Sequence, residues 1–159
     1  LFYLLYIMPN TLTRARPEES RFYYHFIRTG FTSISTSKLF IPLATVIPGT
    51  TLTDLSERYV FLCPFDGSLE TVWARSEGTP GSTVIGFHHS AGAGVEIPNE
   101  TATSGVTIDM GTDDTSYEFD FTGETNTFSQ GDILAFSYDP TNRTYDTHFM
   151  IVLKFDVTT

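Results

Sequence analysis

The stretch GDILAFSYDPTNRTYDTHFMIVLKFDVTT, residues 131–159, decides the fold class. In an extended strand, successive side chains point to opposite faces. In residues 147–157 one face is then fully apolar and is formed by Phe149, Ile151, Leu153 and Phe155. The other face is only half apolar and is formed by His148, Met150, Val152 and Lys154. A sheet with one face in water would not need Met150 or Val152 there, so the sequence predicts that a second surface covers them.

Most of the chain has the pattern of short strands separated by turn residues. Helical signals are few, and only residues 51–59, TLTDLSERY, combine a Thr cap with one turn of helix character. Turn sequences such as PFDG, EGTPG and TGETN separate nine predicted strands, which are 22–28, 38–42, 59–63, 67–76, 82–89, 105–109, 116–122, 132–139 and 147–157. This pattern predicts an all-β fold, an antiparallel two-sheet sandwich that is jelly-roll-like.

Alternation also predicts which side chains of three further strands face the core. In 116–122 the inward set is Tyr117, Phe119 and Phe121, opposite Glu118, Asp120 and Thr122. In 132–139 the two sets are Leu134, Phe136 and Tyr138 on one face and Ile133, Ala135 and Ser137 on the other. In 67–76 they are Leu69, Thr71 and Trp73 against Glu70, Val72 and Ala74. Each strand therefore has one face suited to a core.

The composition predicts one globular domain preceded by an extension. The chain has 159 residues, of which 40% are apolar and 14% aromatic, and such a chain can bury a sizeable core. The composition changes near residue 36, because a basic cluster, the aromatic run RFYYHF and a Ser/Thr run all precede it. We therefore expect an extended N-terminal arm over residues 1–35 and a β-sandwich over residues 36–159.

The charge distribution argues against nucleic acid as a partner. The net charge is −10, and residues 76–159 hold 13 Asp and Glu against 2 Lys and Arg. Such a strongly negative body repels phosphates. The basic cluster between Arg14 and Arg28 has only four arginines, too few for strong counterion release. It therefore favours contact with a protein, with a solvated segment as the alternative.

The first ten residues, LFYLLYIMPN, are strongly apolar. A membrane-spanning helix needs about 20 apolar residues, and the basic lead and cleavage site of a signal peptide are missing. We therefore expect no membrane partner. An exposed apolar arm of this kind is instead expected to seek a partner surface.

The search for chemistry finds no convincing reactive or metal centre. Cys63 is the only cysteine and lies in the apolar run YVFLCPF, so we expect a buried, inert side chain. His88 and His89 are adjacent and point to opposite faces of a strand, so they cannot chelate one metal together. The acidic stretch around Asp113 and Asp114 has a turn as its ordinary interpretation and a bound calcium ion as the alternative. Nucleophile-elbow, phosphate-loop and zinc-protease motifs are missing, so we expect no enzyme and no cofactor.

Several stretches from Tyr59 onward form a recognisable set of motifs. They are YVFLCPFDGSLETVWARSEGTPGSTVIGFH (59–88), VTIDM (106–110), TSYEFDFTG (115–123), FSQGDILAFSYDPTN (128–142) and FMIVLKFD (149–156). In these motifs the chain resembles small virion structural proteins of tailed bacteriophages. The resemblance implies a jelly-roll-like module, commonly trimeric, that is displayed on a capsid or a fibre. Trimer contacts would then give the second apolar face of the last strand a place to pack.

The leading hypothesis is therefore a capsid decoration, or cement, protein on the virion surface, with the major capsid protein as partner and a homotrimer as the assembled form. The residues expected to contact the capsid are Leu1, Phe2, Tyr3, Leu4, Leu5, Tyr6, Ile7, Arg14, Arg16, Arg21, Phe22, Tyr23 and Tyr24. The residues expected at the subunit interface are Met150 and Val152. The alternative is the head domain of a fibre or spike that binds the host surface through loops such as 90–94 and 111–114. A polysaccharide-cleaving enzyme is a third, weaker hypothesis.

Overall fold

The computed structural model describes residues 21–32, 36–43, 59–90, 98–143 and 145–157. Within these ranges the regular structure consists of ten strands, and the predicted helix at 51–59 falls almost entirely outside them. The strands are β1 (Phe22–Thr32), β2 (Leu39–Phe40), β3 (Phe61–Leu62), β4 (Gly67–Ser76), β5 (Gly81–Ser90), β6 (Ser104–Met110), β7 (Ser116–Asp120), β8 (Thr127–Phe128), β9 (Ile133–Pro140) and β10 (Asp146–Asp156). The nine predicted strands are all present, and the two-residue β8 was not predicted.

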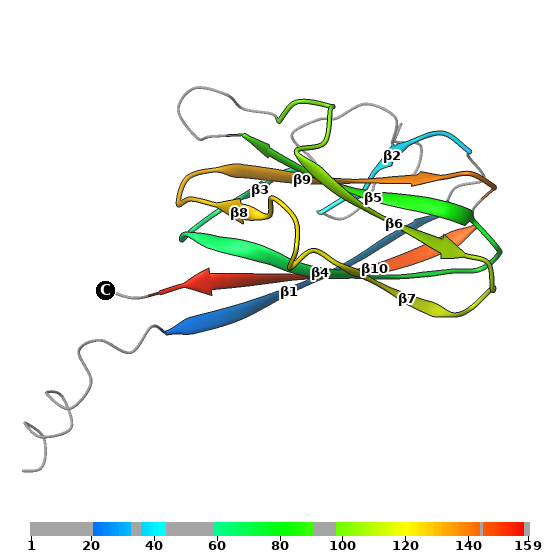
Figure 1. Cartoon of the computed structure of the whole chain (residues 1–159), viewed down its shortest axis with the longest axis horizontal. Helices are drawn as coiled ribbons and strands as arrows, with labels where there is room; N and C mark the ends of the chain where they lie inside the picture. The colour runs from blue at the N-terminus through cyan, green and yellow to red at the C-terminus, as the bar shows by residue number, and fades with distance from the viewer. Residues whose placement is uncertain (1–20, 33–35, 44–58, 91–97, 144, 158–159) are drawn as a thin grey trace, which may run out of the picture.

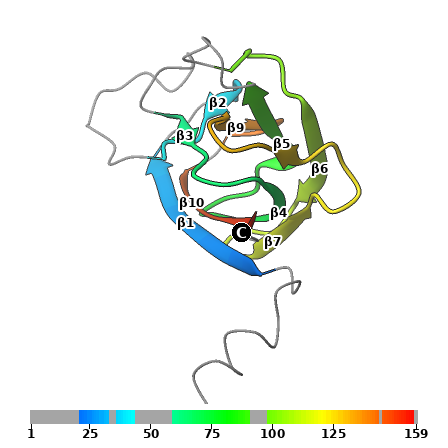
Figure 2. The same cartoon turned by 90° about the vertical axis from the view of Figure 1, so that its left-hand side faces the viewer.

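The strands form two antiparallel sheets that pack face to face, as Figures 1 and 2 show. The first sheet has the order β1-β10-β4-β7, with β8 beside β4. The second sheet has the order β2-β9-β5-β6, with β3 beside β9. The predicted all-β sandwich is confirmed.

The order of pairing is nested, and this defines a jelly roll. β1 pairs with β10, β2 and β3 pair with β9, β4 pairs with β7, and β5 pairs with β6. The chain therefore behaves like one long hairpin that is rolled up, with successive pairs placed alternately in the two sheets. Two Greek keys arranged in this way make the double-sheet jelly roll.

The strand β1 is longer than predicted and belongs to the sandwich. All eleven of its residues pair with β10, from Phe22 opposite Asp156 to Thr32 opposite Asp146. Residues 22–32, which we expected within the arm, are therefore an edge strand of the first sheet. Residues 1–20 lie outside the described residues, so the arm remains a prediction for that part only.

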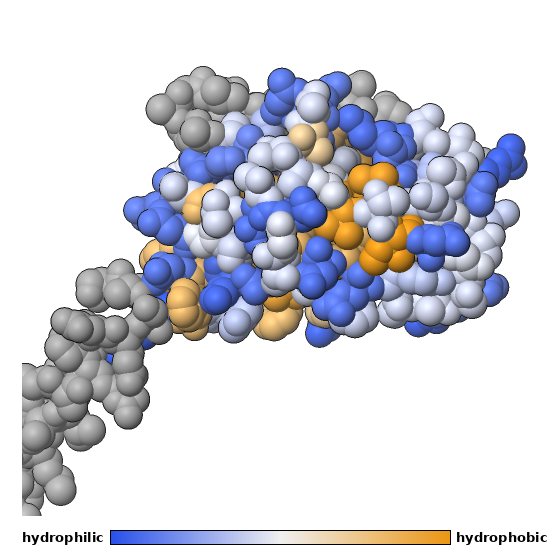
Figure 3. Space-filling model, viewed as in Figure 1, coloured by the Kyte–Doolittle hydropathy of each residue, from blue (hydrophilic) through white to orange (hydrophobic). Residues whose placement is uncertain are grey.

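The core between the sheets is dominated by aromatic side chains. Phe149 of β10 contacts Phe31 and Tyr138, with ring centroids 5.4 Å away in both cases. Phe119 and Phe121 are fully buried, as alternation predicted, and Phe136 is fully buried beside them in the core. Tilted and edge-on ring pairs of this kind stabilise a core beyond the area they bury. The most strongly apolar area of the surface in Figure 3 lies over β6, where Val106 and Ile108 are half-buried against this core.

The predicted facing of β4 is wrong for part of the strand. Leu69 pairs with Leu153, but the next residue of β10, Val152, pairs with Thr71. Glu70 is therefore an extra residue, a β-bulge, and a bulge shifts the alternation by one position. Val72 and Ala74 face the core with 0% and 1% exposure. Trp73, which we expected on the same face as Leu69, lies on the opposite face of the sheet.

Candidate interaction surface

The outer face of the first sheet carries an apolar centre between charged edges. One row of neighbours crosses the sheet from Arg28 through Met150 and Trp73 to Glu118. The next row runs from Phe26 through Val152 and Thr71 to Asp120. Both rows begin on β1 and end at an acidic residue of β7. We call the residues Tyr24, Phe26, Trp73, Met150 and Val152 the aromatic face.

The β1 side of the aromatic face is the most exposed. Phe22, Tyr24 and Phe26 are 51%, 47% and 56% exposed, and they alternate along the outer side of β1. Val152 is only 7% exposed, because its cross-strand neighbours Phe26 and Thr71 flank it. The chain itself therefore covers most of Val152, and the apolar area that remains in water belongs to its aromatic neighbours.

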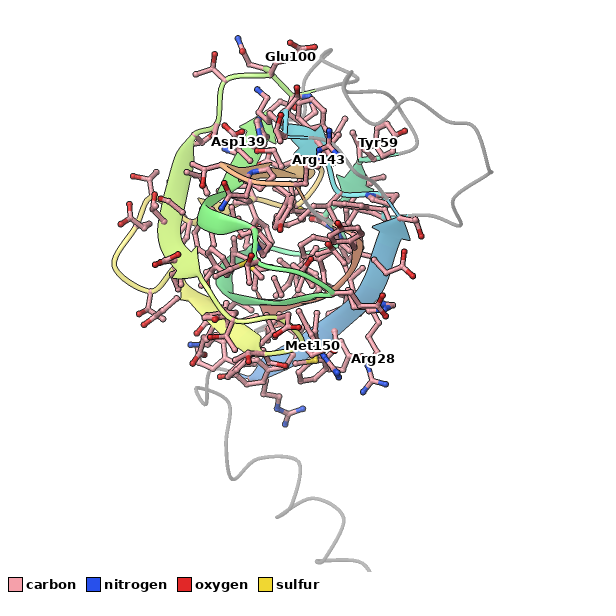
Figure 4. All side chains as sticks on the ribbon, turned by 90° about the vertical axis from the view of Figure 1, so that its right-hand side faces the viewer. Arg28, Tyr59, Glu100, Asp139, Arg143 and Met150 are labelled. Carbon is pink, nitrogen blue, oxygen red and sulfur yellow. The ribbon has the colours of Figure 1, made fainter. Side chains whose placement is uncertain are left out.

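A hollow of about 420 Å³ opens on this same face. Its outward-facing lining is formed by Arg28, Trp73, Arg75, Ser116, His148 and Met150. Figure 4 shows Arg28 and Met150 on one side of the sandwich, away from Glu100 and Asp139. The hollow is open and mostly apolar at its centre, so it suits an apolar side chain from another polypeptide.

The charges on this face are arranged in two zones. Lys154 lies over the ring of Phe22 at 4.1 Å from its centroid, a cation–π contact. Together with Arg28 it makes the β1–β10 side cationic, whereas Glu118 and Asp120 make the β7 side acidic. Arg75 is bound to Asp114 at 3.0 Å. A bound calcium ion was the alternative prediction for Asp113 and Asp114, and the carboxylate of Asp114 is instead paired with an arginine.

The outer face of the second sheet differs because the chain covers the part of it around His88 and Ser137. Thr103 N donates to Phe87 O at 2.7 Å, and Lys38 Nζ donates to Glu100 O at 2.9 Å. These bonds hold residues 98–103 across β5 and β9. A smaller hollow of about 400 Å³ lies at this covered face, next to His88 and Ser137.

His88 fastens this covering segment to the sheet. It is fully buried, and its Nδ1 lies 2.9 Å from Asn99 O. A carbonyl oxygen only accepts, so Nδ1 carries the proton, and Nε2 accepts from Ser137 Oγ at 2.9 Å. Burial lowers the pKa of His88, so the ring stays neutral. Ser137 is also buried, at 3% exposure. The His88–Ser137 pair therefore holds residues 98–103 against the sheet and is not exposed to a substrate.

The remaining residues singled out from the sequence give no reactive centre in the described ranges. Cys63 is buried, and burial together with nearby Asp132 raises the pKa of its thiol to about 12. Across the described residues, no three His, Cys, Asp or Glu side chains gather closely enough to hold a metal ion. The same part of the chain contains no helix long and apolar enough to cross a bilayer.

The structure places only some of the predicted contact residues. Arg21, Phe22, Tyr23 and Tyr24 are exposed at the start of β1, and Met150 is half-buried on the aromatic face. Residues Leu1–Ile7, Arg14 and Arg16 lie outside the described residues, as do residues 91–94 of the loop 90–94 that was proposed for host binding. Their roles therefore stay predictions.

Two residues of the surface were not predicted. Phe26 continues the alternation of Phe22 and Tyr24, so the sequence contained a signal for it. Trp73 had no such local signal, because the bulge at Glu70 is visible only in the pairing of β4 with β10.

Comparison with known proteins identifies no family for this chain. No protein-family model matches it, and no curated relative matches it. A solved structure of Bacillus endospore appendages, which form disulfide-linked pili, is 11% identical with a TM-score of 0.43, over 88% of this chain and 92% of that chain. Turnip yellow mosaic virus gives 12% identity and a TM-score of 0.33, over 87% and 94%.

A third similar structure comes from an enzyme with several modules. It is the Clostridium thermocellum xylanase 10B, CBM22-1-GH10 modules, at 12% identity and a TM-score of 0.39, over 82% of this chain and 28% of that chain. These similarities are too low to argue a function from. The function is therefore inferred from the surfaces of the chain itself.

Proposed function

We propose that this chain is a virion structural protein that decorates the outer surface of a phage capsid. Its partner is the major capsid protein, and its assembled form is a homotrimer. The observation that carries this proposal is the contrast between the two sheets. Residues 98–103 cover the outer face of the second sheet where His88 and Ser137 lie, whereas no described residues cover the aromatic side chains on the first sheet.

An uncovered face of this kind favours an interaction role. Exposed Phe and Tyr side chains in a cluster mark a binding surface more often than isolated ones do. The face is apolar at its centre and along the start of β1, cationic at Arg28 and Lys154, and acidic along β7, so it can meet a second protein with a matching pattern. The trimer contact is expected around Met150, with Val152 beneath it.

The capsid contact is expected from the arm and the start of β1. Residues 1–7 are apolar, Arg14, Arg16 and Arg21 are cationic, and Phe22 to Tyr24 present exposed rings. Such a segment can spread over a neighbouring subunit and exclude water from both surfaces. The sandwich then serves as a stiff body that bridges shell subunits.

Particles test the location directly. Purified virions are analysed by quantitative mass spectrometry and cryo-electron microscopy, and we expect many copies of this chain per particle, with density over the capsid faces. A variant without residues 1–20 should keep the circular dichroism of the sandwich and be missing from the capsids. Full decoration by that variant would contradict the role of the arm.

The fibre-head alternative predicts a different location. Density only at the tail, with few copies per particle, would support it and overturn the decoration role. Complete absence of the chain from particles would overturn both.

A further inference from the structure

The edge of β1 is long, apolar and without a second partner strand among the described residues. β1 pairs with β10 along all eleven residues and ends the order of the first sheet. Its first six residues, 22–27, contain no Lys, Arg, Asp, Glu or Pro, and the first such residue is Arg28. Proteins usually protect an edge strand with charge, proline or a bulge. An unprotected edge is the acceptor used when an extended peptide adds a strand to a sheet.

The N-terminal segment has a sequence that matches this edge. Residues 2–7 are FYLLYI and residues 22–27 are FYYHFI. Phe, Tyr and Ile are identical at the first, second and sixth positions, and the fifth position is aromatic in both. Residues 2–7 also contain no charged residue, Pro or Gly, which is typical of a strand-forming segment.

We propose that residues 2–7 of one copy add as a strand to the edge of β1 in a neighbouring copy. The alternate side chains of the added strand would then lie beside Tyr24 and Phe26, where aromatic cross-strand pairs stabilise a sheet. The contact joins two different surfaces, donor and acceptor. Contacts of this type close into a ring if the rotation between copies allows it, and a ring of three matches the proposed trimer.

The length of the connecting segment favours a neighbouring copy over the same chain. Pairing within one chain would leave residues 8–21 as a hairpin loop, whereas hairpin loops usually have about two to five residues. An extended segment of this length spans roughly 45 to 50 Å at about 3.3 to 3.6 Å per residue. That reach suffices to cross from one sandwich to the next.

This inference rests on the proposed function in one respect, since decoration places many copies close together. It moves residues 2–7 from the capsid contact of the proposed function to the neighbouring copy, and Arg14, Arg16 and Arg21 then make the capsid contact of the arm.

A complementation experiment with full-length chains tests the proposal. The donor variant carries Leu4→Lys and Tyr6→Lys, and the acceptor variant carries Tyr24→Lys and Phe26→Lys. The matched control is Leu62→Lys, because Leu62 is 66% exposed but lies on β3 of the other sheet. All chains are measured by size-exclusion chromatography with light scattering at micromolar concentration.

We expect the wild-type chain and the Leu62 control to have three times the monomer mass of 17.8 kDa. Each double variant alone should be monomeric, with unchanged circular dichroism. An equal mixture of the two should form a heterodimer, because one intact donor meets one intact acceptor and the ring cannot close.

Three outcomes would overturn the proposal: a monomeric wild-type chain, double variants that remain trimeric, or a mixture that stays monomeric. Particle binding is measured separately. If strand addition fails but the double variants still decorate particles, the capsid role stands without it. If the chain forms the expected trimer but does not bind particles, strand addition stands and the capsid role fails.

Discussion

Trp73 of β4 lies directly opposite Met150 of β10 on the outer face of the first sheet. Both residues are half-buried, and they line the hollow between Arg28 and Ser116. The pair is the centre of the aromatic face, so a partner that covers this face must change the surroundings of Trp73.

Trp73 is the only tryptophan, so its fluorescence reports on this face. We expect acrylamide to quench it less in the assembled protein than after dilution to monomers. In Met150→Gln the assembly should weaken at least tenfold, while the free energy of unfolding falls by no more than about 1 kcal/mol, since Met150 is not in the core. Equal quenching at all concentrations would show that no partner copy covers Trp73.

The bulge at Glu70 allows Leu69 before it and Val72 after it to face the core together. Deleting this extra residue leaves a regular ladder with the same facing, because Leu69 and Thr71 already lie opposite consecutive residues of β10. We therefore expect the deletion variant to fold and to lose about 1 to 3 kcal/mol, since Phe121 N loses its acceptor Glu70 O. An alanine inserted between Val72 and Trp73 would instead exchange core and solvent side chains on one side of it, and should lose several kcal/mol or fail to fold. Urea denaturation measures both variants, and an insertion as well tolerated as the deletion would contradict the role of the bulge.

His88 should make the protein less stable in mild acid. Its pKa in the folded state lies below the ordinary value of 6.5, mainly because of burial. Below about pH 6.5 the unfolded chain therefore binds a proton that the folded chain does not, and the free energy of unfolding falls as the pH falls.

The variant His88→Asn isolates this effect. It should be less stable at pH 7.5 by about 1 to 3 kcal/mol, because it leaves a buried hydrogen-bonding group without a partner. Its loss of stability between pH 7.5 and pH 5 should be smaller than in the wild-type chain, as urea denaturation at both pH values would measure. Equal losses in the two proteins would argue against His88 as the cause.

Gly86 leaves room for the bond between His88 and Ser137. A Cβ at this position would clash with Ser137 Oγ and lie 3.2 Å from His88 Nε2. We expect Gly86→Ala to lose about 1 to 3 kcal/mol, as overpacked sites do. Gly123→Ala is the control, because its Cβ would meet no atom within 4 Å. Thermal unfolding compares the two, and similar melting temperatures would mean that the site adapts at little cost.

Cys63 should be unreactive in the folded protein. Its side chain is 1% exposed, and its thiol pKa is raised to about 12, so almost no thiolate is present at pH 8. We expect a thiol reagent such as DTNB to label it only after unfolding in urea. Stoichiometric labelling of the native protein within minutes would show that the β3 region opens easily.

The sequence by itself determined the fold class and most of the core. Alternation with a period of two is a local property, so Phe119, Phe121 and Phe149 could be assigned to the interior from their spacing alone. The turn residues fixed where the nine predicted strands end, to within a few residues. The sequence also indicated that Met150 belongs to a face that is not fully solvated.

The tertiary structure decided which surfaces remain uncovered. The bulge at Glu70 arises where β4 pairs with β10 and turns Trp73 outward, and no local pattern announces it. The covering of His88 by residues 98–103 likewise depends on contacts between segments far apart in the chain. Facing within a strand follows from local geometry, but exposure of a face depends on what the rest of the chain places over it.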